Sequence, residues 1–404
     1  MTLRNKTINA SNLFDGDKVI WMILFVLCII SVLEVYSASS TMTFNKGAYW
    51  APVLKHGLFL CVGVSVAWCT HKIPQRYFGY IAVCGIILSI IFLAITMLRG
   101  QTTNDAARWM DLGFFSFQPS EIAKGSLVML AAVLLSYFRD EEGATATAFK
   151  WVLGITCFIC ALIVTENLST AALTFFIILL MMFIAQVPWK LLGSLLGLLV
   201  IGAALGYSAL RFTPDNVLDK FEGTKLERVK TWSHRLRNHV DFPDDPKEYD
   251  LNTNPQITQS HIAIATCNVI GRGPGNSRVR DFLPQAYSDF IYAIIIEELG
   301  IAGGFIVVAL YIILLFRAAQ IARRSDSMML SFMVLGLALL IVTQALINMA
   351  VAVGIFPVTG QPLPLVSRGG SSIMVNCFYI GLMINISRTA LKTDSGSSLE
   401  PLNA

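Results

Sequence analysis

The most regular feature of the chain is a series of apolar stretches separated by polar connections. Most of them approach the ~20 residues that a helix needs to cross a membrane. Ten can be drawn, with approximate ranges 19–38, 54–71, 77–98, 119–138, 151–166, 170–187, 189–211, 288–316, 328–349 and 370–388. The pattern predicts an all-α polytopic membrane protein with ten transmembrane helices.

One connection is much longer than the others and covers residues 212–287, between the seventh and eighth predicted helices. The predicted organisation is an N-terminal tail (1–18), a membrane domain (19–388) and a disordered tail rich in Ser and Gly (389–404). No internal repeat is evident in the sequence, which disfavours a transporter built from inverted repeats.

Composition supports a membrane protein and excludes several other classes. The chain is 55% hydrophobic and 14% charged, whereas a soluble protein carries roughly a quarter charged residues. A formal charge of +4 is too small to indicate a nucleic-acid partner. Seven of the eight cysteines fall in or beside apolar stretches, so no disulfide framework or zinc spacing is visible, and no metal ligands are assigned.

The distribution of Lys and Arg predicts the orientation. Segments on the side of the two termini carry 13 of them, and the short loops on the other side carry 5. Cytoplasmic loops are the ones enriched in Lys and Arg. Both termini are therefore predicted to be cytoplasmic and the 212–287 loop to be outside.

Two short helices are predicted within this loop. Apolar residues recur at three- and four-residue spacing among Lys and Arg over 221–240, which indicates an amphipathic helix. It could lie on the membrane surface or pack on the bundle. A second helix is expected over 256–266.

The first cluster of candidate site residues combines Arg108 with Glu121 and Lys124. Pro119 suits a first helical turn, and Glu121 there complements the helix dipole. Glu121 and Lys124 are three residues apart on one helix face, so they can pair. Lys124 and Arg108 also suit an anionic lipid headgroup.

The second cluster surrounds Asp289. The preceding Gly- and Arg-rich segment 271–280, which includes Arg272, could approach a phosphate closely. Asp289 is either a helix-start residue capped by Ser288 or a general base at the membrane surface. Glu297 lies about 12 Å further along a helix and roughly 80° around it, so Glu297 and Glu298 are interpreted as structural.

The third cluster is rich in Pro and Gly and covers residues 348–372. Such irregular backbone at membrane depth is tolerated only where it is buried in protein or lines a cavity. We therefore expect a re-entrant loop that carries Ser367 and Arg368 and leads to Ser371.

These clusters resemble the SEDS family (shape, elongation, division and sporulation), whose members include FtsW, RodA and SpoVE. The C-terminal signature is matched by Asn348, Gly354, Pro357, Gly360, Pro364, Ser367, Gly369, Gly370 and Ser371. Arg108-Trp109 with Gln118-Pro-Ser-Glu-x-x-Lys124 resembles a second motif. Phe282-Leu-Pro-Gln-x-x-Ser-Asp289 with Glu297-Glu298 resembles a third.

The resemblance implies a peptidoglycan glycosyltransferase of the cytoplasmic membrane that polymerises lipid II at the outer leaflet, with a class B penicillin-binding protein and other division proteins as partners. The division-type member is preferred, which implies a septal location. The family's essential aspartate corresponds to Asp289. Substrate-binding candidates are Lys124, Arg108, Glu121, Arg272, Ser367, Arg368 and Ser371. A divalent cation, Mg²⁺ or Mn²⁺, is the candidate cofactor.

Three positions depart from the family pattern. Asn167 replaces a carboxylate, with Glu166 one residue before it, and Gln361 and Arg368 stand where other residue types are commoner. Three alternative functions remain: a lipid II flippase, a scaffold for the transpeptidase and an elongation-type polymerase like RodA.

Overall fold

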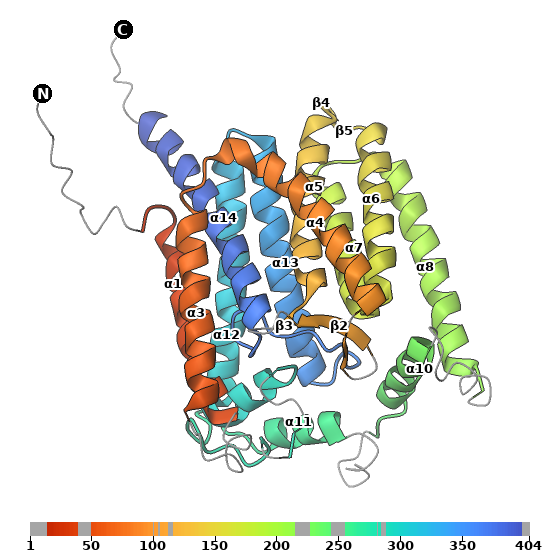
Figure 1. The fold of residues 1–404 in the computed structure, drawn as a ribbon, viewed down its shortest axis with the longest axis vertical. Coiled ribbons are helices and arrows are strands. Elements are labelled where there is room, and N and C mark those ends of the chain that lie inside the picture. Colours follow the sequence, from red (N-terminus) through yellow and green to blue (C-terminus); the bar gives the residue numbers. More distant parts are fainter. Residues whose placement is uncertain are drawn as a thin grey trace, which may run out of the picture.

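Each predicted apolar stretch forms a helix in the computed structural model (Figure 1), which describes residues 14–38, 50–99, 101–103, 106–111, 116–214, 227–243, 255–280, 282–283 and 288–397. Within this part, nine helices are long and apolar enough to cross a membrane, and α7 is a shorter apolar helix. The bounds are α1 Lys18–Ala38, α3 Ala51–Thr70, α4 Phe78–Arg99, α5 Pro119–Tyr137, α6 Ala146–Val164, α7 Leu168–Ile184, α8 Trp189–Phe212, α12 Ile291–Arg324, α13 Met328–Ala352 and α14 Gly370–Ser397. The predicted all-α membrane fold is confirmed.

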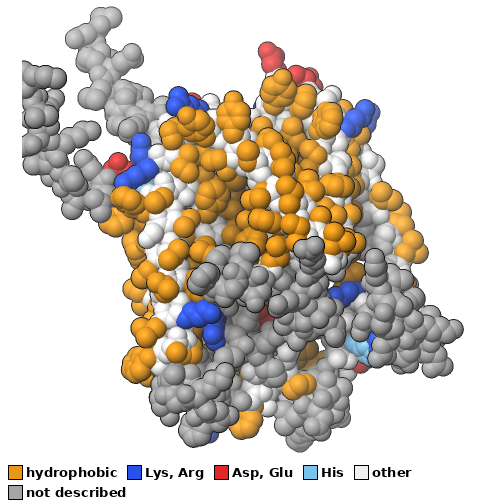
Figure 2. Space-filling view, viewed as in Figure 1, with side chains coloured by type: hydrophobic (Ala, Val, Ile, Leu, Met, Phe, Trp, Pro, Cys, Tyr) orange, Lys and Arg blue, Asp and Glu red, His pale blue; other side chains and the backbone are white. Residues whose placement is uncertain are grey.

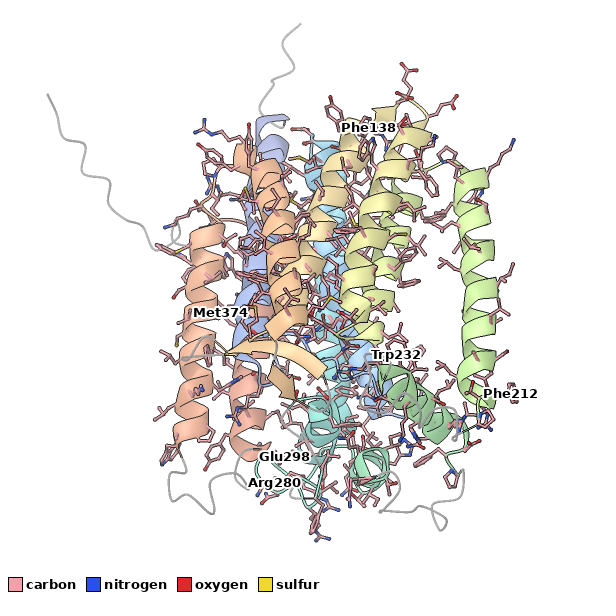
Figure 3. All side chains as sticks on the ribbon, turned by 45° about the vertical axis from the view of Figure 1, so that its right-hand side comes forward. Phe138, Phe212, Trp232, Arg280, Glu298 and Met374 are labelled. Carbon is pink, nitrogen blue, oxygen red and sulfur yellow. The ribbon has the colours of Figure 1, made fainter. Side chains whose placement is uncertain are left out.

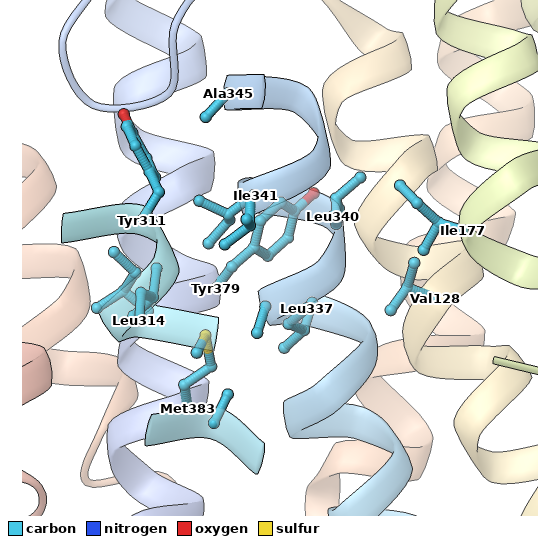
Figure 4. Close-up of a cluster of buried hydrophobic side chains, with 14 of the residues drawn as sticks. Val128, Ile177, Tyr311, Leu314, Leu337, Leu340, Ile341, Ala345, Tyr379 and Met383 are labelled. Atoms are coloured by element: carbon cyan, nitrogen blue, oxygen red, sulfur yellow. The ribbon is translucent and has the colours of Figure 1, made fainter. Parts of the chain in front are cut away.

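The helices stand side by side in one bundle, with α13 and α14 largely buried and α8 mostly exposed at one edge (Figure 1). Tyr311 of α12, Leu337 and Ile341 of α13, and Tyr379 and Met383 of α14 belong to the central apolar core (Figure 4). On the face shown in Figure 2, hydrophobic side chains cover most of the described flank, and the charged side chains that are visible lie mainly above and below this area. This is the surface that a bilayer requires.

We refer to the end of the bundle that carries the two loop helices as the outer end, after the orientation that the distribution of Lys and Arg predicts. The amphipathic helix α10 (Glu227–Val240) and the short helix α11 (Pro255–Ala265) were both expected from the sequence. Helix α10 packs on α8, where Ser233 Oγ donates to the carbonyl of Leu210 at 2.6 Å. In α11, Ser260 Oγ donates to the carbonyl of Ala352 at 2.6 Å.

The remaining elements are small. Strands β1 (Gln101–Thr103), β2 (Ala106–Asp111) and β3 (Ser116–Phe117) form an antiparallel sheet before α5. Toward the opposite end, β4 (Arg139–Asp140) pairs with β5 (Gly143–Ala144), and η2 (Gln75–Tyr77) precedes α4. Helix α14 continues to Ser397, so the predicted disordered tail over 389–404 is wrong for 389–397. Its last residues, 398–404, lie outside the described part.

Helix α12 is broken at Gly300, where φ is 77° and ψ is −179°. An unbroken helix of 34 residues would be about 51 Å long, well beyond the ~30 Å hydrocarbon core. Instead, the Tyr292 hydroxyl donates to the carbonyl of Gly304 at 3.3 Å. Segment 291–299 therefore folds back along the start of the membrane-crossing segment 301–324.

Candidate active site

The Pro- and Gly-rich connection between α13 and α14 re-enters the bundle, as expected. Its backbone is held by buried side chains: Ser31 Oγ of α1 donates to the carbonyl of Val366 at 2.7 Å, and the Tyr311 hydroxyl donates to the carbonyl of Pro364. Gly354 and Gly360 have positive φ values of 80° and 66°. Irregular backbone at this depth is thus enclosed by protein.

Asp289 is fixed by this loop and by α13. The side-chain amide of Asn348 donates through Nδ2 to the backbone carbonyls of Asp289 and Gln361, at 2.8 and 2.7 Å. Ser367 Oγ donates to the carbonyl of Ser288. The side chain of Asp289 is half-buried, and its Oδ1 accepts a hydrogen bond from Ser288 Oγ at 3.0 Å.

The reading of Asp289 as a conventional capped helix start is wrong. Helix α12 begins at Ile291, and its N-cap residue is Phe290, which provides no side-chain cap. The Ser288 hydroxyl contacts the neighbouring carboxylate rather than a helical amide. Asp289 therefore lies before the helix, at the end of a segment whose position is set by the re-entrant loop.

Lys124 and Glu121 form the predicted ion pair, and both are deeply buried. Lys124 Nζ lies 2.8 Å from Glu121 Oε1, with exposed fractions of 1% and 2%. Lys124 also donates to the amide oxygen of Gln344 at 2.7 Å. Gln344 donates in turn to the carbonyl of Pro362 at 3.0 Å, one helical turn from Asn348. Side chains of α13 thus link Lys124 to the loop that holds Asp289.

A basic residue whose charge interacts with Asp289 comes from α10. Arg235 is half-buried, and its Nη1 donates to the carbonyl of Val358 at 3.1 Å. Burial lowers the pKa of Arg235, and the nearby Asp289 carboxylate raises it in opposition. The sequence predicted the helix but did not place this arginine in the site. The available signal was its spacing of seven from Arg228, which puts both on one helix face.

Glu297 and Glu298 are structural, as predicted. The sequence placed them deeper in the membrane than Asp289, whereas the structure places them further towards the outer end than Asp289. Because α12 folds back at Gly300, they face the outer end, where Glu298 and Arg280 are close together (Figure 3). Glu298 accepts hydrogen bonds from the amides of Gly275 and Ser277, at 2.9 and 3.2 Å. Their predicted placement deeper in the membrane is wrong.

The Gly- and Arg-rich segment is bound by these two glutamates rather than placed over Asp289. Arg272 lies 3.5 Å from Glu297 as an ion pair, and the Arg278 amide donates to Glu297 at 2.9 Å. The backbone amides of Arg272 and Gly273 donate to the carbonyls of Glu297 and Glu298. The sequence suggested that the amides of this segment bind phosphate. In the structure they instead bind the end of the helical segment that precedes Gly300.

The other predicted substrate-binding residues occupy different surroundings. Ser367 bonds within the protein, accepting from the Leu363 amide at 2.8 Å. Ser371 is buried at the start of α14, and half-buried Arg368 interacts electrostatically with His56. Arg108 is in strand β2, but its side chain lies outside the described part.

Two departures from the family pattern have local explanations. Asn167 is the N-cap of α7, and its Oδ1 accepts from the amides of Ser169 and Thr170 at 3.0 and 3.3 Å. Asn and Asp cap helices about equally well, so Asn167 keeps the capping function of the carboxylate that it replaces. Gln361 is buried and donates to Thr170 Oγ1, which ties the re-entrant loop to α7.

Within the part of the chain that the structure describes, no group of three or more His, Cys, Asp or Glu side chains is placed to hold a metal ion. Among the described residues, Asp289 is thus not part of a protein-built cage for Mg²⁺ or Mn²⁺.

The fold and the site define a class: a multi-pass membrane protein with a half-buried carboxylate fixed beside a re-entrant loop. The chain belongs to the cell cycle protein family FTSW_RODA_SPOVE, whose model matches residues 17–392. The resemblance seen in the motifs is therefore confirmed.

Individual relatives agree with the family assignment. A probable peptidoglycan glycosyltransferase FtsW from Marinobacter nauticus is 34% identical, covering 89% of this chain and 86% of its own. One from Coxiella burnetii is 28% identical, covering 91% and 95%. The fold matches one chain of a solved structure, "Structural coordination of polymerization and crosslinking by a peptidoglycan synthase complex", with a TM-score of 0.71, 20% identity and coverage of 93% and 98%.

Proposed function

We propose that this protein is a peptidoglycan glycosyltransferase that polymerises lipid II into glycan strands during cell division. Relatives along most of its length are named as probable enzymes of this kind. The observation that carries the proposal is the placement of Asp289, whose backbone is fixed by Asn348 and whose carboxylate is half-exposed beside the re-entrant loop. A fixed carboxylate is suited to act as a general base.

The proposed reaction is a single inverting displacement. Asp289 accepts the proton of the acceptor sugar's 4-hydroxyl as that oxygen attacks the anomeric carbon of the donor. The bond from this carbon to the phosphate oxygen breaks, and undecaprenyl pyrophosphate leaves with the bonding electrons. The contacts of Asn348 and Ser367 limit movement of the base, which lowers the entropic cost of reaching the reactive arrangement.

The role of Lys124 in this proposal is positioning. Its ammonium donates to Glu121 and Gln344, and its side chain is 1% exposed. Gln344 and Asn348 lie on the same face of α13, so Lys124 supports the surface on which the re-entrant loop and Asp289 rest. A direct contact with a lipid headgroup would require these buried contacts to open.

The proposed location is the cytoplasmic membrane at the division septum, with both termini cytoplasmic. The excess of Lys and Arg on the side of the termini supports that orientation. We further propose a class B penicillin-binding protein as partner, supported by the fold shared with a chain of a peptidoglycan synthase complex. Fluorescent fusions observed in dividing cells test the location: a signal along the side wall would favour an elongation role.

Asp289→Asn provides the decisive test. Purified variant and wild type are incubated with lipid II and the partner, and glycan chains are separated by length. We expect the variant to form no polymer while melting at the wild-type temperature, whereas Asp140→Asn, a change at an exposed acid beyond the opposite end of the bundle, remains active. Substantial polymer from Asp289→Asn would overturn the assignment.

A parallel assay separates the polymerase from a flippase. Vesicles loaded with fluorescent lipid II report transbilayer movement independently of chain growth. Movement without polymer formation by the wild-type protein would favour the flippase. Unchanged function of Asp289→Asn and Lys124→Met in cells would favour the scaffold.

A further inference from the structure

A cavity of about 150 Å³ lies between α10 and the outer ends of α7 and α8, beside Val358 of the re-entrant loop. Trp232 of α10, which lines it, is labelled in Figure 3. The volume equals that of about five water molecules. It therefore suits a small polar group better than a disaccharide.

The polar lining of this cavity is cationic. Arg228, Thr231 and Arg235 of α10 contribute to one wall, and their spacing of three and four residues puts them on one face of the helix. Asn167 and Ser169 contribute from the N-terminal end of α7, where the helix dipole is positive. Among the described residues that line the cavity there is no carboxylate. Two guanidiniums that line one cavity together with the N-terminal end of a helix favour an anion.

The cavity adjoins the candidate base. Arg235 lines it, donates to the carbonyl of Val358, and is close enough to Asp289 for their charges to interact. An anion in the cavity would therefore lie beside the reacting centre. The apolar lining from Leu168, Leu210 and Leu236 lowers the local dielectric, which strengthens a guanidinium–phosphate contact.

Two of the cations suggested by the sequence are engaged elsewhere. The ammonium of Lys124 is held by Glu121 at 2.8 Å, and the guanidinium of Arg272 lies 3.5 Å from Glu297. Each of these charges already faces a buried carboxylate. The guanidiniums of Arg228 and Arg235 line the cavity itself, and Arg235 also interacts with the half-buried carboxylate of Asp289.

We propose that Arg228 and Arg235 form the subsite that receives the pyrophosphate of the departing lipid carrier. This inference rests on the proposed glycosyltransferase function. As the acceptor's 4-oxygen forms its bond to the anomeric carbon and its proton passes to Asp289, the carbon–oxygen bond to phosphate breaks. The negative charge that develops on the pyrophosphate is stabilised by the two guanidiniums, an electrostatic contribution that increases in the transition state.

Binding measurements test the subsite without requiring catalysis. Wild type, Arg228→Gln, Arg235→Gln and Arg235→Lys are reconstituted in phosphatidylcholine nanodiscs and titrated with undecaprenyl pyrophosphate. Each Gln variant should bind about tenfold or more weakly, as expected for loss of a charged hydrogen bond. Arg235→Lys should be intermediate, because it keeps the charge but loses the planar fork. Arg323→Gln, at an exposed arginine near the opposite end of α12, is the matched control and should bind like wild type.

Competition identifies the source of the phosphate. Inorganic pyrophosphate should displace undecaprenyl pyrophosphate from the wild type, and phosphatidylglycerol should not. Equal displacement by phosphatidylglycerol would overturn the assignment to the leaving group. Unchanged affinity of Arg228→Gln and Arg235→Gln for undecaprenyl pyrophosphate would overturn the subsite, whatever the melting temperatures of the two variants.

A kinetic comparison separates this inference from the proposed function. Arg235→Gln should lower kcat of polymerisation, with Arg235→Lys restoring part of it. In one outcome, Asp289→Asn abolishes polymerisation, but Arg228→Gln and Arg235→Gln bind undecaprenyl pyrophosphate and polymerise normally. The proposed function then stands and the subsite fails. If the wild type binds undecaprenyl pyrophosphate through these arginines but makes no polymer, the subsite stands and the function fails.

Discussion

The hydroxyl of Tyr292 donates to the carbonyl of Gly304, 3.3 Å away, although the two residues are 12 apart in sequence. In a straight helix they would be separated by about 18 Å along the axis. The contact shows that segment 291–299 folds back. This puts Asp289 at one end of the segment, beside the re-entrant loop, and Glu298 at the other, beside Ser37 at the outer end of α1.

Gly300 makes this reversal possible, and Gly300→Ala should disrupt it. The positive φ disfavours alanine, and a Cβ would lie 2.3 Å from the carbonyl oxygen of Val269. Strain of this kind costs about 1–3 kcal/mol before the clash is added. We expect a clear fall in melting temperature and faster proteolysis of segment 271–283.

Gly206→Ala is the matched control for Gly300→Ala. Gly206 is in the interior of α8, and nothing lies within 4 Å of the position its Cβ would take. Alanine is favoured over glycine in a helix by about 1 kcal/mol. This variant should be as stable as wild type or slightly more stable. Equal behaviour of the two variants would contradict the proposed reversal at Gly300.

The buried pair of Lys124 and Glu121 can be tested by a double-mutant cycle. Lys124→Met leaves the Glu121 carboxylate uncompensated at 2% exposure, and such a change costs about 3–5 kcal/mol. Glu121→Gln should cost a similar amount, whereas the double variant should recover much of the stability. Unfolding of the solubilised protein measures all four corners of the cycle.

Polymerisation by the double variant separates positioning from substrate contact. If Lys124 acts only by supporting α13 and the re-entrant loop, activity should return together with stability. A stable but inactive double variant would instead require the ammonium itself, and the positioning role would be rejected.

The membrane helices could be predicted from sequence because hydrophobicity acts over whole segments. The amphipathic pattern similarly predicted α10, and the three-residue spacing of Glu121 and Lys124 predicted their 2.8 Å contact. The prolines and glycines near Gly360 predicted a re-entrant loop, because irregular backbone needs protein around it. These features depend on neighbours in the sequence.

Features that depend on long-range contacts could not be predicted in the same way. The apolar run from Ile291 is compatible with one straight helix, and the reversal is fixed by residues such as Asn268 and Val269, whose carbonyls accept from the amides after Gly300. The approach of Arg235 to Asp289 spans 54 residues and requires the packing of α10 on α8. For this reason the sequence predicted the wrong depth in the membrane for Glu297 and Glu298.

His261 of α11 should make stability depend on pH. Its ring packs against Gly354 and lies 5.2 Å from the ring of Phe242, and burial lowers its pKa from the ordinary value of 6.5. Below that value the unfolded chain binds a proton that the folded protein does not. Stability should therefore fall as pH decreases below 6.5, by up to about 1.4 kcal/mol per unit of pKa difference.

Melting curves of wild type and His261→Gln between pH 7.5 and pH 5 would measure this effect. The variant should show a smaller loss of stability on acidification. His234→Gln, at an exposed histidine of α10, serves as the control and should follow the wild-type profile. Parallel profiles for all three proteins would show that His261 does not carry the dependence.

Asn167 allows a test of whether a carboxylate is needed at the start of α7. Its Oδ1 accepts from two backbone amides, so Asn167→Ala should cost about 0.5–2 kcal/mol through loss of the cap. Asn167→Asp keeps an acceptor in the same place and should match wild type in melting temperature and in polymer yield. A several-fold increase in polymer from Asn167→Asp would mean that the charge takes part in the reaction. In that case Glu166→Gln, which removes the neighbouring buried acid, should lower the wild-type yield, because Glu166 would be the residue that supplies the charge in this chain.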